Sequence, residues 1–287
     1  MSKPFLRWAG GKRWLVNSHF EFYPQNYERY IEPFIGGGAV FFNMKPHNFI
    51  ISDINPDLID CYDSIKTEAS KFFDRLKIHH RNHSKEYYYK MRDSLPRTKH
   101  GRAAKFLYLN RACFNGLYRV NSKGQFNVPI GTSQNIILAS DNFCEISELL
   151  CRGQIVCQDF EKTIDLAESG DFIFIDPPYT VKHNLNGFVQ YNEKIFSWED
   201  QIRLRDAAVR AVGRGAMITI TNANHPSIHS IYQELPNTKI NIVSRNSLIA
   251  GQLIDRGKTT EVVIRMGWEA AFNDLGLFDE GSLNVLS

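Results

Sequence analysis

Apolar and polar residues follow two different spacings along this chain. Near the N-terminus, RYIEPF at residues 29–34 and NFIIS at residues 48–52 have strand character, and the helical stretch AVFFNM follows a glycine turn between them. Strand-like apolar runs return at residues 153–158, 171–175, 215–221, 238–244 and 260–266. Residues 197–212 have helical spacing, and the spacing of Ser197 and Asp200 predicts a capping box at the helix start.

The middle of the chain has a different texture. From about Pro56 to Cys151, apolar residues recur three and four apart in residues 57–66, 69–77, 84–95 and 101–114, and no strand signal of comparable strength interrupts them. We therefore predict a parallel-type α/β domain that is split by a helical insertion. The acidic residues after Trp268 lack periodicity, and we expect a loosely packed tail there.

Charge is concentrated in the predicted insertion. The chain of 287 residues has a net charge of +3, but residues 75–123 contain 13 lysines or arginines and only two acids, Glu86 and Asp93, a net charge of +11. Aromatic residues are interleaved with these cations, as expected of a protein that binds a phosphate backbone, and we expect lysines such as Lys105 to contact phosphate. The alternative is a basic helical face that is merely solvated.

Two other features bear on location and metal binding. There is no run of 18 apolar residues, and the first residues lack the layout of a secretory signal, so we expect a soluble, cytoplasmic protein. The five cysteines are odd in number and form no C-x-x-C pair. We expect reduced thiols and no metal site.

A glycine turn follows the first predicted strand, in EPFIGGG at residues 32–38. It lacks the dinucleotide spacing G-x-G-x-x-G, because Phe41 stands at the third glycine's place. At the end of the second strand, Asp53 can accept hydrogen bonds from ribose hydroxyls, which indicates a nucleoside-containing cofactor. Alternatively, Asp53 caps the helix that begins near Pro56. Earlier in the chain, FLRWAGGKRW is either a loop with a buried tryptophan or a cover for one end of the cofactor.

The sharpest signal is DPPY, at the end of the strand in residues 171–175. Two prolines make the loop rigid, and a carboxylate and outward carbonyls can accept both hydrogens of an amino group. The tyrosine offers a flat face for the ring that bears this amine. An exocyclic amine of a nucleobase fits, whereas a capped turn with a packed tyrosine is the plainer alternative.

Several motifs in order make the chain resemble the Dam-type DNA adenine methyltransferases, which use S-adenosylmethionine. The resemblance extends from Phe5 to about Gly267 and includes FLRWAGGK, EPFIGGG, SDIN, LYLNRACFNGLYR, GQFNVPIG, DPPY and RNSLIAGQLIDRGKTTEVVI. It implies a Rossmann-like α/β methyltransferase sheet. The implied domains are a catalytic domain at residues 1–56 and 152–270, a mostly helical DNA target-recognition domain at 57–151, and a tail at 271–287.

The resemblance also implies roles for individual residues. The implied cofactor site comprises Trp8, Ala9, Gly10, Lys12, Phe34, Gly36, Gly37, Gly38, Asp53, Ile54, Asp159, Phe160 and Asp176. The implied catalytic residues are Asp176, Pro177, Pro178 and Tyr179. The implied DNA contacts are Arg7, Arg111, Phe114, Asn115, Arg119 and Asn127, with Arg119 reading a guanine. Arg7 stands where the family usually has lysine, and Phe114 where it often has tyrosine.

These features predict methylation of the adenine amino group in double-stranded DNA, within GATC, by base flipping and direct transfer. No metal and no obligate protein partner are expected, and the chain is expected to be a monomer. One alternative is a methyltransferase for an RNA base or for the cytosine amino group. Others are a nicotinamide dehydrogenase, which the glycine spacing disfavours, and a DNA-binding relative without catalysis.

Overall fold

The computed structural model describes residues 3–121, 124–181, 196–246 and 258–268. Its strands form a seven-stranded sheet in the order β3-β2-β1-β4-β5-β7-β6. Parallel pairs join β2 to β3, β1 to β4 and β4 to β5, whereas β7 is antiparallel to both β5 and β6. The predicted α/β class is confirmed. The prediction of a parallel-type sheet is wrong at β6 and β7, because an apolar run does not specify the direction of its neighbour.

Contacts divide the chain into two units, residues 1–20 with 34–159 and residues 21–33 with 160–287. Each unit is described by itself below. These bounds differ from the domain boundaries expected from sequence, which stay a prediction, and the expected tail at residues 271–287 lies outside the described residues.

Of the elements in the described residues, the first unit contains two parallel strands and most of the helices. Its strands are β2 (Phe49–Asp53) and β3 (Gln154–Cys157), and its helices are α1 (Arg13–Ser18), α2 (Ala39–Met44), α3 (Pro56–Arg81), α4 (Lys85–Asp93), α5 (Lys99–Ala112), the 3-10 turn η2 (Phe114–Gly116) and α6 (Phe143–Leu150). A further 3-10 turn, η1 (Phe20–Phe22), lies where the two units meet in sequence. Asp53 pairs with Cys157 across β2 and β3, so both strands end at one edge.

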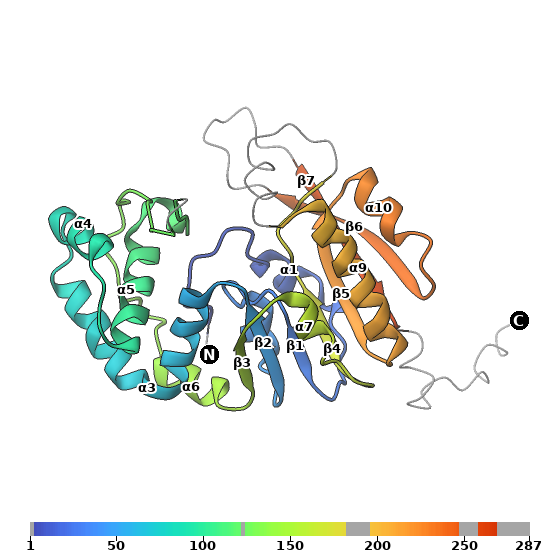
Figure 1. The fold of residues 1–287 in the computed structure, drawn as a ribbon, viewed down its shortest axis with the longest axis horizontal. Helices are drawn as coiled ribbons and strands as arrows, with labels where there is room; N and C mark the ends of the chain where they lie inside the picture. The colour runs from blue at the N-terminus through green and yellow to red at the C-terminus, as the bar shows by residue number, and fades with distance from the viewer. Residues whose placement is uncertain (1–2, 122–123, 182–195, 247–257, 269–287) are drawn as a thin grey trace, which may run out of the picture. The chain divides into compact units, whose positions relative to one another are not determined.

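The predicted helical insertion is confirmed as helices α3 to α6 between β2 and β3 (Figure 1). The first two expected segments form one helix, α3, which is interrupted at Glu68, where φ is −140° and ψ is 39°. Polar side chains cap these helices at their starts: Asn55 caps α3, Ser84 caps α4 and Thr98 caps α5. The start of each of these helices is thus set by a capping side chain nearby in sequence, and its buried face by the spacing of apolar residues.

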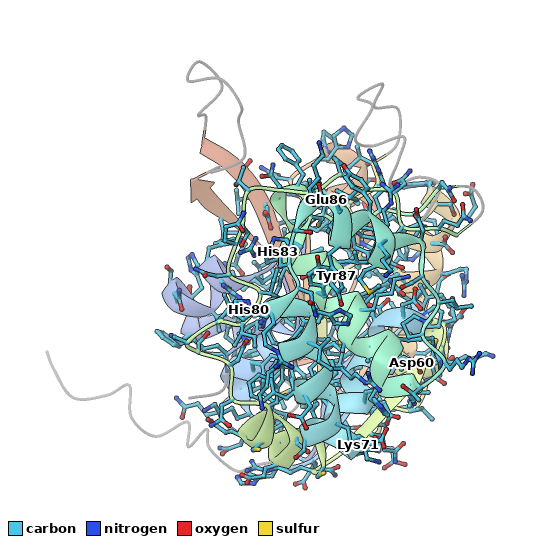
Figure 2. All side chains as sticks on the ribbon, turned by 90° about the vertical axis from the view of Figure 1, so that its left-hand side faces the viewer. Asp60, Lys71, His80, His83, Glu86 and Tyr87 are labelled. Atoms are coloured by element: carbon cyan, nitrogen blue, oxygen red, sulfur yellow. The ribbon has the colours of Figure 1, made fainter. Side chains whose placement is uncertain are left out.

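Helices α3 and α5 pack along each other (Figure 1). Aromatic side chains, among them the buried His79 and Tyr108, lie between them. The rings of His79 and Tyr108 stack with centroids 5.0 Å apart. Nδ1 of His79 lies 2.9 Å from the Tyr87 hydroxyl, and Nδ1 of His83 lies 3.0 Å from the Tyr108 hydroxyl. His83 lies in the turn between α3 and α4, Tyr87 lies in the first turn of α4, and both lie well above Lys71 in Figure 2. These bonds join α3, α4 and α5 into one body.

In its described residues, the second unit contains the other five strands and three helices. They are β1 (Tyr30–Glu32), α7 (Phe160–Ile164), β4 (Phe172–Ile175), α9 (Trp198–Gly213), β5 (Met217–Ala223), α10 (Pro226–Tyr232), β6 (Thr238–Asn246) and β7 (Lys258–Met266). The capping box predicted at Ser197 and Asp200 is confirmed at the start of α9. No helix among the described residues is long and apolar enough to cross a membrane.

Candidate functional site

The glycine turn of the first unit is a tight turn that follows Ile35. The Ile35 amide donates a hydrogen bond to the Ser52 carbonyl at 2.9 Å. Gly36 and Gly38 have φ of 44° and 66°, a region that glycine adopts without strain. A Cβ atom on Gly38 would lie 2.8 Å from the Tyr62 hydroxyl, which itself donates to the Gly36 carbonyl. The turn is therefore closed on its inner side by side chains, and only glycine fits there.

Asp53 lies at the end of β2 and contacts this turn. Its carboxylate accepts the Gly36 amide at 3.2 Å and the Asn55 amide at 3.0 Å. Burial raises the pKa of Asp53, against the lowering effect of these amides. The residue that caps α3 is Asn55, which accepts the Asp57 and Leu58 amides, so the capping alternative for Asp53 is wrong. A carboxylate has about four acceptor positions, which leaves room for a ligand hydroxyl.

Trp8 and Lys12, which were expected together at the cofactor, have different contacts. The indole of Trp8 packs on the glycine turn, since a Cβ on Gly36 would lie 2.8 Å from its Cδ1 and Nε1 atoms. The ammonium of Lys12 is buried and donates to the Gly10 carbonyl at 2.9 Å. Of the remaining expected cofactor residues in this unit, Ala9, Gly10 and Ile54 are exposed, and Phe34, Gly37 and Asp159 are half-buried. The turn, Asp53 and Trp8 are thus brought together around one short stretch of backbone.

In the second unit, the DPPY loop begins where β4 ends. Strand β5 runs parallel to β4 with Ile175 opposite Ile220, which brings Thr221 beside Asp176. The Thr221 hydroxyl donates to Oδ1 of Asp176 at 2.7 Å. Pro177 is buried and Pro178 half-buried. Asp176 is thus held from the neighbouring strand.

Tyr179 is fixed by a residue far along the chain. Its hydroxyl donates to Oε2 of Glu261 at 2.7 Å, and Glu261 is 4% exposed on β7. Burial raises the pKa of Tyr179 well above its usual value, and the carboxylates of Asp176 and Glu261 add to this effect. The phenol is therefore neutral, and the hydrogen bond sets the plane of its ring.

Buried side-chain hydrogen bonds stabilise the residue that follows the DPPY loop. The Gln201 side chain of α9 donates to the Thr180 carbonyl at 3.3 Å, and the Asn222 amide donates to Gln201 at 3.1 Å. Phe160, expected at the cofactor, is buried against Phe196, with the Arg203 guanidinium 4.8 Å from its ring centroid. Inside the unit, Phe160 thus supports the region that follows the loop.

The expected DNA contacts belong to the first unit, and several lie together. Arg7 is exposed, and its backbone exchanges two hydrogen bonds with the Asn110 side chain, at 2.9 and 2.7 Å. Gly116 of η2 lies against the Arg7 side chain. The neighbouring Phe114 and Asn115 are exposed, Phe114 to 52%, and Asn115 has a left-handed φ of 54°.

Arg119 and Asn127 pair across a short hairpin. Nε of Arg119 donates to the Asn127 side chain at 2.9 Å, and the Asn127 amide donates to the Arg119 carbonyl at 3.1 Å. A β-bridge joins Val120 and Phe126. Arg119 is exposed at this position. The Asn127 side chain therefore orients the guanidinium group of Arg119 on this hairpin.

Two cations expected on the DNA surface are turned inward instead. Arg111 is 0% exposed, and its guanidinium forms a two-pronged ion pair with Asp141 and donates to the Phe5 and Ile136 carbonyls. The ammonium of Lys105 donates to main-chain carbonyls at the end of α4, and burial lowers its pKa. The structure contradicts the expectation for Arg111, because its guanidinium is fully buried. Lys105 is half-buried and its ammonium is bound to two main-chain carbonyls, which disfavours a phosphate contact.

Three residues in these arrangements were missed from sequence. Thr221 and Glu261 lie in strands that contain several polar residues, so the local pattern does not single them out. Their partners depend on the strand register. Tyr118 precedes Arg119 and stacks on Trp8 with centroids 5.7 Å apart, a contact that no local pattern indicates.

Comparison with known proteins places these residues in a family. A family profile described as D12 class N6 adenine-specific DNA methyltransferase matches residues 8–248. Type II methyltransferase M1.LlaDCHI of Lactococcus lactis subsp. cremoris is 38% identical over 271 residues, covering 91% of this chain and 94% of the relative. Type II methyltransferase M.MjaIII of Methanocaldococcus jannaschii is 38% identical over 243 residues, covering 77% and 84%. The DNA adenine methylase of Vibrio cholerae is 33% identical over 266 residues, covering 91% and 95%.

Proposed function

The chain belongs to the D12 class N6 adenine-specific DNA methyltransferase family, and we propose that it methylates the exocyclic amino group of adenine in double-stranded DNA, with S-adenosylmethionine as the methyl donor. The observation that best supports this function is the DPPY loop, in which Thr221 holds the Asp176 carboxylate beside a rigid pair of prolines. This arrangement suits an amine that is planar and weakly nucleophilic before reaction.

The first unit supplies groups that fit the donor. S-adenosylmethionine provides an electrophilic methyl group on a sulfonium. Asp53 accepts a ribose hydroxyl, and the Gly36–Gly38 turn allows close approach of the backbone. Trp8 and Lys12 cover one end of the ligand. The wall that these residues form is rigid, because the turn is packed against Trp8 and Tyr62.

The second unit supplies acceptors for the amine. The lone pair of the adenine amino group is delocalised into the ring, so the neutral nitrogen is a poor nucleophile. Hydrogen bonds from its two protons to the Asp176 carboxylate and the Pro177 carbonyl favour the pyramidal geometry of the transition state. Tyr179 stacks on the base and recovers part of the few kcal/mol spent in unstacking it from the duplex.

DNA is read by the exposed residues of the first unit. The Arg119 fork donates to the two major-groove acceptors of a guanine, a pairing worth about 1–3 kcal/mol of discrimination. Phosphate contacts come from the exposed cations of the basic segment. They include Arg75, Lys77, Arg81, Lys85, Lys90 and Arg97.

Transfer of a labelled methyl group tests the proposal. We expect label to enter duplexes with unmethylated adenine but not duplexes whose target adenines already carry an N6-methyl group. Asp176→Ala should abolish transfer and still bind DNA, because the basic segment is separate in the chain from DPPY. Asp176→Asn should retain part of the activity, since its amide oxygen is still an acceptor. Near-normal transfer by Asp176→Ala, or label found on cytosine, would refute the proposed reaction.

We further propose GATC as the target, because FNGLYR and GQFNVPIG resemble the recognition segment of family members that act on GATC. Plasmid treated with the protein should become resistant to a nuclease that is blocked by GATC adenine methylation, and sensitive to one that requires it. Plasmid that incorporates methyl groups yet stays fully cut by the blocked nuclease would overturn GATC and leave adenine methylation standing.

A further inference from the structure

Tyr118 lies at a junction inside the first unit. Its ring stacks on Trp8 with an interplanar angle of 20°, and it packs on Phe106 of α5 and on Phe126 of the hairpin, with centroids 5.3 and 5.9 Å away. Its hydroxyl donates to Asp57 in the first turn of α3 at 3.2 Å. One side chain therefore contacts the N-terminal loop, two helices and the hairpin.

The partner of this stack, Trp8, is confined by the glycine turn. A Cβ on Gly36 would lie 2.8 Å from the indole, and a Cβ on Gly37 would lie 3.0 Å from the Trp8 Cβ. The indole thus has one side against the turn and its face toward Tyr118. A ligand that displaces the turn or the indole therefore acts on the tyrosine ring that is stacked on the indole.

The other end of the junction is the reading hairpin. Tyr118 is joined directly to Arg119, and Arg119 is held by the side chain and amide of Asn127. Movement of the Tyr118 side chain that is passed to its backbone therefore changes the position from which the Arg119 side chain extends.

We propose that Tyr118 is a positioning residue that couples occupancy of the glycine turn to the placement of Arg119 on DNA. The inference rests on the proposed function, since it needs both a ligand at the turn and DNA at the hairpin. Coupling of this kind is reciprocal: the factor by which the ligand tightens DNA binding equals the factor by which DNA tightens ligand binding. A factor of about 5 to 150 is typical of such coupling.

The test measures DNA dissociation constants by fluorescence anisotropy, with and without S-adenosylhomocysteine, which occupies the donor's place without reacting. For the unmodified protein we expect DNA affinity to rise at least about fivefold with the ligand. In Tyr118→Leu the factor should fall to about 1, while the affinity for S-adenosylhomocysteine alone stays within about twofold. Tyr118→Phe, which keeps the stacked ring, should keep the coupling.

Phe126→Leu is the matched control, because Phe126 packs on Tyr118 without a stacking contact to Trp8 among the described rings. It should lower thermal stability and leave the coupling factor unchanged. The proposal is overturned if Tyr118→Leu retains the factor of the unmodified protein, if Tyr118→Phe loses it, or if the unmodified protein has none. Failure of the unmodified protein to bind S-adenosylhomocysteine or DNA at all would instead refute the proposed function.

A second measurement covers the case in which Tyr118→Leu does not fold. With 5-fluorotryptophan incorporated, the ¹⁹F resonance of Trp8, assigned from its loss in Trp8→Phe, should shift when DNA is added to the otherwise unmodified protein without ligand. An unchanged Trp8 resonance at saturating DNA would contradict the proposal.

Discussion

The hydrogen bond from the Tyr179 hydroxyl to Glu261 connects the DPPY loop to a strand more than 80 residues later in the chain. Because Glu261 is 4% exposed, its carboxylate needs this partner, and the tyrosine ring is held in one plane as a result. A residue that never touches the base can thus determine how well the base stacks. We therefore expect replacement of Glu261 to affect catalysis more than folding.

We predict that Glu261→Leu lowers kcat/KM for DNA by about tenfold, or about 1.4 kcal/mol, because the ring loses its acceptor. Glu261→Gln, which keeps an acceptor oxygen, should stay within about threefold. The check is steady-state kinetics of both variants in the unmodified and Tyr179→Phe backgrounds. An equal loss from Glu261→Leu in both backgrounds would mean that the hydrogen bond is not the route.

At the scale of helices and strands, prediction from sequence succeeded where the cause is local. The capping box at Ser197 depends on a residue three positions away, and the glycine turn depends on adjacent residues. Arg111 could not be placed in this way, because its acceptor at Phe5 lies 106 positions earlier. The strand order and the antiparallel β6–β7 pair likewise depend on connections, which apolar spacing does not encode.

Lys105 closes the end of helix α4, where the last carbonyls lack partners within the helix. We predict that Lys105→Met lowers the free energy of unfolding by about 1–2 kcal/mol and leaves the salt dependence of DNA binding unchanged. The matched variant Lys85→Met, at an exposed site in the first turn of α4, should reduce the salt slope by about one and leave stability unchanged. Urea unfolding and binding at several salt concentrations check both. A reduced salt slope for Lys105→Met would restore it as a phosphate contact.

Packing of α3 on α5 has a pH dependence through His79. Burial lowers the pKa of His79 to about 4, and Arg75 and Lys105 add to this. In the unfolded chain its pKa is about 6.5, so between pH 6.5 and 4 the unfolded state binds more protons. The free energy of unfolding therefore falls as pH falls through this window and is constant above it.

From pH 7 to pH 5 we expect a loss of about 2 kcal/mol from this group. His79→Asn keeps an acceptor near Tyr87 but does not titrate, so its loss over the same interval should be smaller by about that amount. Urea unfolding followed by circular dichroism at the two pH values decides this. Equal losses in both proteins would exclude His79 as the source.

At the scale of the whole molecule, a ligand that binds the glycine turn of the folded state raises the free energy of unfolding of the chain. S-adenosylhomocysteine at 100 times its Kd should add about 2.7 kcal/mol, measured as a rise in Tm. Asp53→Ala should lose most of this increment, because the ligand loses an acceptor. Asn55→Ala removes the cap of α3, so it should lower the starting stability by about 1 kcal/mol and keep the increment. An unchanged increment in Asp53→Ala would remove Asp53 from the ligand site.

The hairpin that bears Arg119 is held by three main-chain bonds, from Asn127 to Arg119, from Asn121 to Gln125 and from Gly124 to Asn121, and by side-chain bonds of Arg119, Asn121, Gln125 and Asn127. Main-chain bonds do not depend on which side chains the two strands present. The hairpin can therefore keep its strands paired after a substitution at Arg119, because the Arg119 carbonyl still accepts the Asn127 amide. The recognition sequence can then change during evolution, so that related proteins methylate different DNA sites. A library of variants confined to a few hairpin positions could likewise change the specificity of this protein.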